Sequence, residues 1–126
     1  MTGAELAAFC AQSAENKMRY WMGTCCYPCT KELYLRKRAQ YPAHYGQSRA
    51  ARYQADIAAG AMCADCVGLI KGAAWTELGA HAAKYQSGGC PDKGANGLYR
   101  WCVRQGMAHG EMAALPETPG LLLHKD

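Results

Sequence analysis

Apolar residues at helical spacing mark the stretch from residue 62 to 75 as the centre of this chain. One stripe with the spacing of a buried helix contains Val67, Ile70, Ala74 and Leu78. Asp65 precedes the stripe and suits the N-cap position, where a carboxylate accepts from free backbone N–H groups. Gly68 and Gly72 leave one face bare, although glycine costs about 1 kcal/mol relative to alanine in a helix. The pattern therefore predicts a turn at 62–65, with no buried strand before it, and then a closely packed helix.

Four flanking segments, 2–17, 30–40, 46–59 and 92–106, also show helical patterns. Their boundaries are marked by capping, proline and glycine signals at Thr2 with Glu5, Thr30, Pro42, Gly60, Asp92 and Gly106. Between them lie an aromatic segment that breaks at Gly23 and a glycine-rich loop at 79–93. The only strand expected is short and apolar, at residues 121–123. We expect an α+β fold that is mostly helical.

Length and composition indicate the number of domains and the class of protein. A length of 126 residues suits a single domain spanning 1–126, and 50% hydrophobic with 19% charged residues is typical of a globular chain. No apolar run approaches the length that spans a bilayer, so we expect no membrane partner. The N-terminus lacks the features of a secretory signal. We therefore expect the chain to be cytoplasmic at synthesis, with phage association or release as the route to any extracellular target.

The net charge of +4 is concentrated in one part of the chain. Six basic residues and one acidic residue lie between Lys31 and Tyr53, a local charge of +5. Such a segment forms either the solvated faces of two helices or a surface that attracts anionic cell-wall polymers or nucleic acid. Because no aromatic ladder or nucleic-acid motif accompanies the charge, we expect no nucleic-acid partner.

Eight cysteines are many for this length. Disulfides are one explanation, although the expected compartment is reducing. Two C-x-x-C pairs, Cys26/Cys29 and Cys63/Cys66, offer four thiolates for a zinc-binding helical module, although their separation exceeds that of common zinc ribbons. A thioredoxin-like pair at Cys63 and Cys66 is a third explanation, but the sequence shows no parallel strand before it.

Cys66 has a further property, because it falls in the first turn of the predicted central helix. The partial positive charge at a helix N-terminus favours the thiolate, which is the nucleophilic form of cysteine. A nucleophilic role and inert packing are the two interpretations of such a residue.

The string Asp65-Cys66-Val67-Gly68-Leu69-Ile70 resembles the nucleophile motif of the NlpC/P60 cysteine peptidases, including their bacteriophage and gut-bacterial members. Tyr20 and Gly23 match the Tyr-x-x-Gly entry motif of that family, and the 30–59 helices and the 91–99 segment are similar to those of the same subgroup. The resemblance implies a papain-like fold, of which this chain carries the helical half and the start of the sheet.

The same resemblance implies a thiol peptidase that cleaves peptidoglycan stem peptides next to γ-D-glutamate. Cys66 would be the catalytic nucleophile, Tyr20 and Asp65 would bind the substrate, and neither a cofactor nor a metal would be needed. The family's general-base histidine lies on a Gly-His strand that the sequence does not reach, and His124 does not match it. We therefore expect a C-terminally incomplete domain, inactive alone, whose base comes from a partner chain or a further segment.

Overall fold

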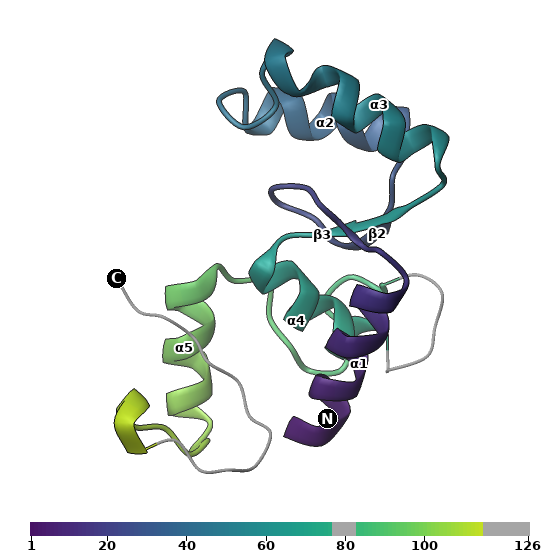
Figure 1. The fold of residues 1–126 in the computed structure, drawn as a ribbon. Coiled ribbons are helices and arrows are strands. Elements are labelled where there is room, and N and C mark those ends of the chain that lie inside the picture. Colours follow the sequence, from purple (N-terminus) through teal and green to yellow (C-terminus); the bar gives the residue numbers. More distant parts are fainter. Residues whose placement is uncertain (77–82, 115–126) are drawn as a thin grey trace.

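Helices surround a small sheet in this chain (Figure 1). The computed structural model describes residues 1–76 and 83–114, which form an α+β domain of five α-helices and a three-stranded mixed sheet. The α-helices are α1 (Gly3–Glu15), α2 (Lys31–Gln40), α3 (Ala50–Ala58), α4 (Cys66–Trp75) and α5 (Ala95–Arg104). The strands are β1 (Arg19–Tyr20), β2 (Cys25–Pro28) and β3 (Met62–Ala64), and 3-10 turns occupy Gln47–Arg49 and Met112–Ala114.

The sheet has the order β1-β3-β2, and β3 pairs parallel with β1 and antiparallel with β2. The expectation that no buried parallel strand precedes Cys66 is therefore wrong, as is the expectation of a single strand. Residues 121–123 lie outside the described residues. A three-residue strand is too short to show the alternation by which strands are predicted, and its cysteine and alanine do not favour the strand state.

The predicted helices agree with the structure in four of five places. Thr2 forms the capping box of α1, and Thr30 caps α2 by accepting from the N–H of Leu33. The 46–59 prediction is confirmed as a 3-10 turn followed by α3. The exception is α5, whose N-cap is Gly94 rather than Asp92. Asp92 caps no helix because its carboxylate is engaged by Lys71 and Tyr85.

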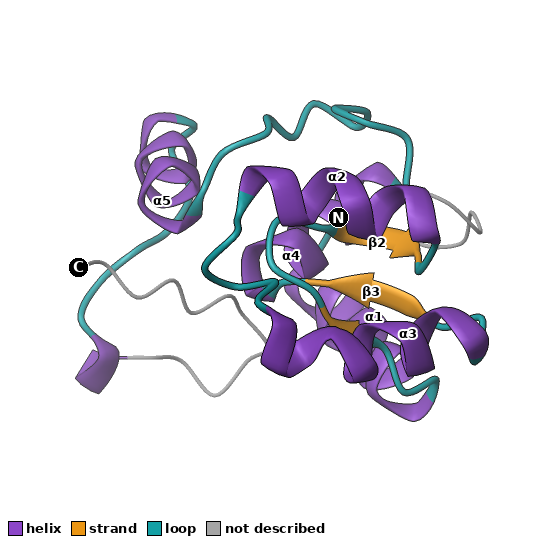
Figure 2. Cartoon of the chain, turned by 90° about the horizontal axis from the view of Figure 1, so that it is seen from above, coloured by secondary structure: helices purple, strands orange, loops and turns teal. Residues whose placement is uncertain are grey.

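Two groups of buried side chains hold the domain together. The aromatic core contains rings from the β1–β2 region, α2, the segment after α2 and α3, namely Trp21, Tyr34, Tyr45 and Tyr53, together with Cys29, Leu33 and Cys63. The α4 core lies below it and contains Cys25, Val67, Trp75, Cys90 and Leu98. Tyr27 packs against both cores. Seen from above, α2 and α3 flank the sheet, and α4 lies beneath (Figure 2).

The bare face of α4 is confirmed, because the helix packs directly on the backbone of the β2 region. A Cβ atom at Gly68 would collide with the carbonyl oxygen of Thr24, and one at Gly72 would collide with Sγ of Cys26. Only glycine permits this approach. The close packing brings the first turn of α4 beside the Gly23 loop. Among the described residues, no helix has the length and apolar character to cross a membrane.

Candidate functional site

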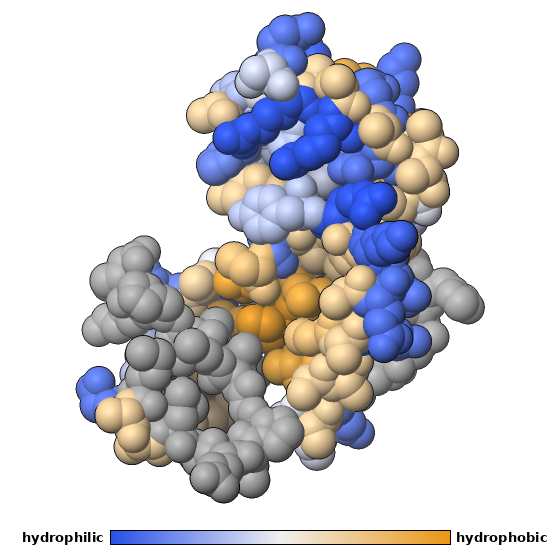
Figure 3. Space-filling model, in the orientation of Figure 1, coloured by the Kyte–Doolittle hydropathy of each residue, from blue (hydrophilic) through white to orange (hydrophobic). Residues whose placement is uncertain are grey.

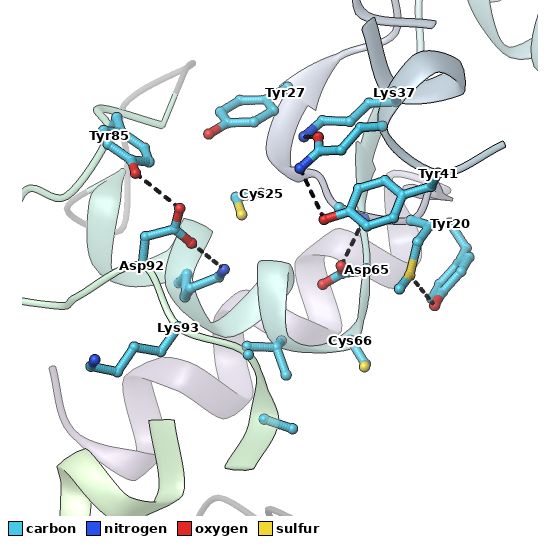
Figure 4. Close-up of a pocket in the computed structure, with 17 residues that line it drawn as sticks. Tyr20, Cys25, Tyr27, Lys37, Tyr41, Asp65, Cys66, Tyr85, Asp92 and Lys93 are labelled. Atoms are coloured by element: carbon cyan, nitrogen blue, oxygen red, sulfur yellow. Dashed lines mark hydrogen bonds and ion pairs between the residues drawn. The ribbon is translucent and has the colours of Figure 1, made fainter. Parts of the chain in front are cut away.

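Cys66 is the first residue of α4, and it is the one exposed cysteine among the eight. It lines an open groove of about 470 Å³ that is walled by the Gly23 loop, the end of α2, α4 and the segment before α5. Figure 4 shows Cys66 at one end of this groove, beside Tyr20 and Asp65. Exposure at the opening turn of a helix leaves the sulfur accessible to a substrate and close to backbone N–H groups.

Asp65 connects the two segments of the resemblance. One carboxylate oxygen accepts from the N–H of Gly68 at 2.6 Å, which confirms Asp65 as the N-cap of α4. The other oxygen accepts from the N–H of Gly23 at 2.9 Å. Gly23 has a φ of +77°, a conformation that favours glycine. The carboxylate thus holds the Tyr20–Gly23 turn against the helix that carries Cys66.

Tyr20 lies next to this pair and is 54% exposed, so its ring is available to a ligand in the groove. Burial of part of the side chain raises the pKa of its hydroxyl, and the neighbouring Cys66 and Asp65 raise this pKa further. The structure therefore brings together the three residues that the sequence singled out, Tyr20, Asp65 and Cys66. Whether Tyr20 and Asp65 bind substrate stays a prediction.

The other end of the groove contains a lysine that sequence reasoning missed. Lys71 extends from α4 with its side chain 10% exposed, and its Nζ lies 2.7 Å from Oδ1 of Asp92. Tyr85 donates to Oδ2 of the same carboxylate at 2.9 Å (Figure 4). The hydrogen bond from Lys71 holds the pKa of Asp92 below its usual range. A lysine within an apolar helical stripe was the available signal, because burying an unpaired ammonium is costly.

Six of the other seven cysteines are protected by burial. Burial raises the pKa of the Cys25 thiol to about 11 and that of Cys26 to about 12, and it raises the pKa of Cys63 as well. Burial also raises the pKa of Cys29, Cys90 and Cys102. A thiol with a raised pKa is a poor nucleophile at neutral pH because little thiolate is present.

The structure does not bring the two C-x-x-C pairs together as a metal site. Among residues 1–76 and 83–114, no group of three or more potential ligands could hold a metal ion. Cys63 is fully buried in the aromatic core and Cys26 packs against Gly72, whereas Cys66 faces solvent. The zinc interpretation of these four cysteines is therefore not supported by their geometry.

No imidazole lines the groove within the described part of the chain. His44 and His109 are exposed elsewhere, and the ring of His44 faces Tyr41 edge-on while that of His109 faces Tyr99. His81 and His124 lie outside the described residues. The arrangement thus supplies a nucleophile, a groove and helix-opening N–H donors, and the described residues contribute no histidine base to it.

A second, smaller hollow of about 240 Å³ adjoins Cys66 on its other side, between α1 and α4. Small and apolar side chains such as Ala14, Ala64 and Leu69 line it, together with Cys10. Cys66 therefore lines both hollows.

Comparison with known proteins assigns the chain to no family. No family model, no curated protein and no solved structure matches the chain.

Proposed function

We propose that the chain is the nucleophile-bearing part of an NlpC/P60-type cysteine peptidase, with a peptidoglycan stem peptide as its substrate. The observation that carries the proposal is the position of Cys66, an exposed thiol on the first turn of α4 at the edge of a groove. Its connection through Asp65 to the Tyr20–Gly23 turn supports the proposal, because both sequence segments of the resemblance meet at one place.

The chemistry follows from that position. A base removes the Cys66 proton, and the thiolate attacks an amide carbonyl carbon to form a C–S bond. The C–N bond then breaks, the amine leaves with the proton from the base, and water hydrolyses the resulting thioester. Asp65 occupies the N–H of Gly68, so the N–H groups of Cys66 and Val67 are the helix-opening donors available to an oxyanion.

The proposed general base is an imidazole that lies outside the described residues, either on a further segment or on a partner chain. At the substrate end, the Asp65 carboxylate keeps lone pairs beyond the two used by Gly68 and Gly23. These can pair with the free amino group of a stem peptide, and the exposed Tyr20 ring can cover the same end.

Iodoacetamide labelling tests the nucleophile. At pH 7.5, Cys66 should react at least about tenfold faster than any buried cysteine, because the buried thiols carry raised pKa values. Peptide mapping by mass spectrometry gives the rate at each position. Cys10, which is half-buried, is the internal comparison. Equal rates at Cys66 and Cys10 would remove the case for an activated thiol.

Substrate protection tests the peptide class. The tripeptide L-Ala-γ-D-Glu-meso-diaminopimelate should slow the labelling of Cys66 and leave Cys10 unchanged, whereas the same tripeptide with an acetylated N-terminus should protect less. The reason is that Asp65 pairs with an ammonium but not with an amide. Identical protection by the two tripeptides would contradict the role of Asp65, and no protection by either would contradict the stem-peptide assignment.

A further inference from the structure

The outer surface of α2 and α3 concentrates positive charge that the fold does not use. We define the basic arm as the six cations of these helices and the turn between them: Lys31, Arg36, Lys37, Arg38, Arg49 and Arg52. All of them are exposed except Lys37, which is half-buried. In the space-filling view, hydrophilic side chains gather over α2 and α3 at one end of the molecule (Figure 3).

Carboxylates of the same helices do little to cancel this charge. Glu32 is exposed, but Asp56 of α3 is turned inward. Its two oxygens accept from Nε of Arg19 at 3.0 Å and from Nε1 of Trp21 at 2.9 Å. Among the described residues the ion pairs are Arg19–Asp56 and Lys71–Asp92, and neither involves the basic arm.

Several guanidinium groups of the arm are held in place by neutral partners. Arg38 lies over the Tyr34 ring at 6.0 Å from its centroid, and Arg52 lies over Tyr53 at 4.8 Å. Arg49 donates to the carbonyl of His44 at 3.1 Å. These contacts orient the side chains without neutralising them, so each guanidinium keeps donors for an anion.

The surroundings of these cations restrict the kind of partner. Leu35 is the one large exposed hydrophobic side chain on α2 and α3, and protein interfaces depend on apolar and aromatic anchors. Of the tyrosines in and between these helices, those at 34, 45 and 53 are buried in the aromatic core, and the half-buried Tyr41 lies beneath Lys37. A single partly exposed ring makes no ladder on which successive nucleobases could stack. What is left is a surface of oriented cations that matches repeated phosphates without reading bases.

We infer that the basic arm binds the phosphodiester backbone of a linear polyanion. Binding of this kind releases counterions, so its strength falls steeply with salt. Lys37 extends the charge from α2 into the groove, which it lines (Figure 4). Cys66 is not one of the six cations, although Lys37 lines the same groove, and the inference does not depend on the proposed peptidase activity.

The test measures binding of the full chain to poly(glycerol phosphate) by fluorescence anisotropy between 50 and 200 mM salt. Six contacts predict a log–log salt slope of about −4, which corresponds to a loss of about 250-fold over this range. Single-stranded DNA of equal charge should bind with a similar slope, because the arm recognises the phosphodiester backbone alone, and a clearly different slope would contradict this. Poly-L-glutamate of equal charge should bind more weakly.

Two matched variants locate the surface. The double variant Arg36→Gln/Arg38→Gln should reduce the slope to about −3 and weaken binding about tenfold at 50 mM salt. Arg100→Gln/Arg104→Gln removes two exposed arginines from one face of α5 and should leave the salt slope and the affinity at 50 mM salt unchanged. Cys66→Ala should also leave binding unchanged, which separates this inference from the peptidase proposal. Equal binding to poly-L-glutamate, or equal losses in the α2 and α5 variants, would overturn the inference.

Discussion

Single residues show how the same chemical type acquires different roles from its surroundings. Cys66 and Cys25 both line the groove, but only Cys66 is exposed, whereas burial raises the pKa of Cys25 to about 11. Asp65 and Asp92 are both groove carboxylates, and each oxygen of both accepts one hydrogen bond. Asp65 holds backbone N–H groups, and Asp92 neutralises a lysine that the fold buries. Burial and hydrogen bonding therefore distinguish the exposed thiol from the groups that stabilise the groove around it.

Replacement of Asp92 by Asn should show that its charge stabilises the domain. The variant leaves Lys71 buried without a counter-charge, and we expect a loss of about 1–2 kcal/mol in the free energy of unfolding at pH 7, a value reduced for the partial exposure of Asp92. Because the folded-state pKa of Asp92 is lowered, this stabilisation is present above about pH 3.9 and is lost as the pH falls through the folded-state pKa.

Urea unfolding at pH 7 and pH 2.5 measures the difference. The difference between the two proteins should shrink at the lower pH, because protonation of the wild-type carboxyl group removes its charge. Tyr85→Phe is the control, since it removes one hydrogen bond and keeps the ion pair. An equal loss at both pH values would mean that the carboxylate charge contributes nothing.

At the scale of elements, the packing of α4 on the β2 region positions the candidate site. Gly68 and Gly72 allow the helix to approach the backbone at Thr24 and the side chain at Cys26. Cys26 itself has a φ of +59° and lies where the β2–β3 register shifts. This bulge turns the Cys26 side chain toward α4. One irregular residue in a short strand therefore fixes the position of the helix on the sheet.

A Gly72→Ala substitution should therefore destabilise the fold, although alanine favours a helix. The added methyl group meets Sγ and Cβ of Cys26, and we expect a loss of at least about 2 kcal/mol. In a Cys26→Gly background these two contacts are removed, glycine suits the positive φ, and the milder contact with the Cys25 carbonyl carbon at 3.3 Å remains. The same substitution should then cost less than about 1 kcal/mol. Chemical denaturation of the wild type, the two single variants and the double variant gives the free energies of this double-mutant cycle.

Gly46→Ala is the matched control, because nothing lies within 4 Å of its Cβ position and its φ is −64°. It should change the free energy of unfolding by less than about 0.5 kcal/mol. An undiminished cost of Gly72→Ala in the Cys26→Gly background would show that the steric account is wrong.

For the whole molecule, the small sheet joins two cores that could otherwise act as separate units. The aromatic core lies on the side of α2 and α3, and the α4 core lies on the other side. Cys63 of β3 belongs to the first core, Cys25 of β2 belongs to the second, and Tyr27 packs against both. Shared strands of this kind should couple the unfolding of the two sides.

Buried cysteines report on that coupling without any mutation. Pulse labelling with iodoacetamide at increasing urea should expose Cys29 and Cys63 of the aromatic core at the same midpoint as Cys25 and Cys90 of the α4 core. Mass spectrometry of the digested protein gives each midpoint, with Cys66 as the cysteine labelled at every urea concentration. Two separate midpoints would show that the cores unfold independently.

The sequence by itself determined the helices, the N-caps of α1, α2 and α4, and the candidate nucleophile. Capping residues at Thr2, Thr30 and Asp65 act within one turn of chain, and the amphipathic spacing of α4 is a local pattern. The bare Gly68/Gly72 face also predicted a close approach, although not the partner. These features depend on neighbours in sequence, so they can be read without coordinates.

Tertiary structure alone decided the sheet, the groove and the pairing of charges. β3 is three residues long and is stabilised by ladders to β1 and β2, segments that are more than 30 residues away in the sequence. The Lys71–Asp92 pair likewise joins a helix to a distant loop, which removed Asp92 from its predicted capping role. Contacts of this kind arise from burial against distant segments, and a local pattern of residues does not encode them.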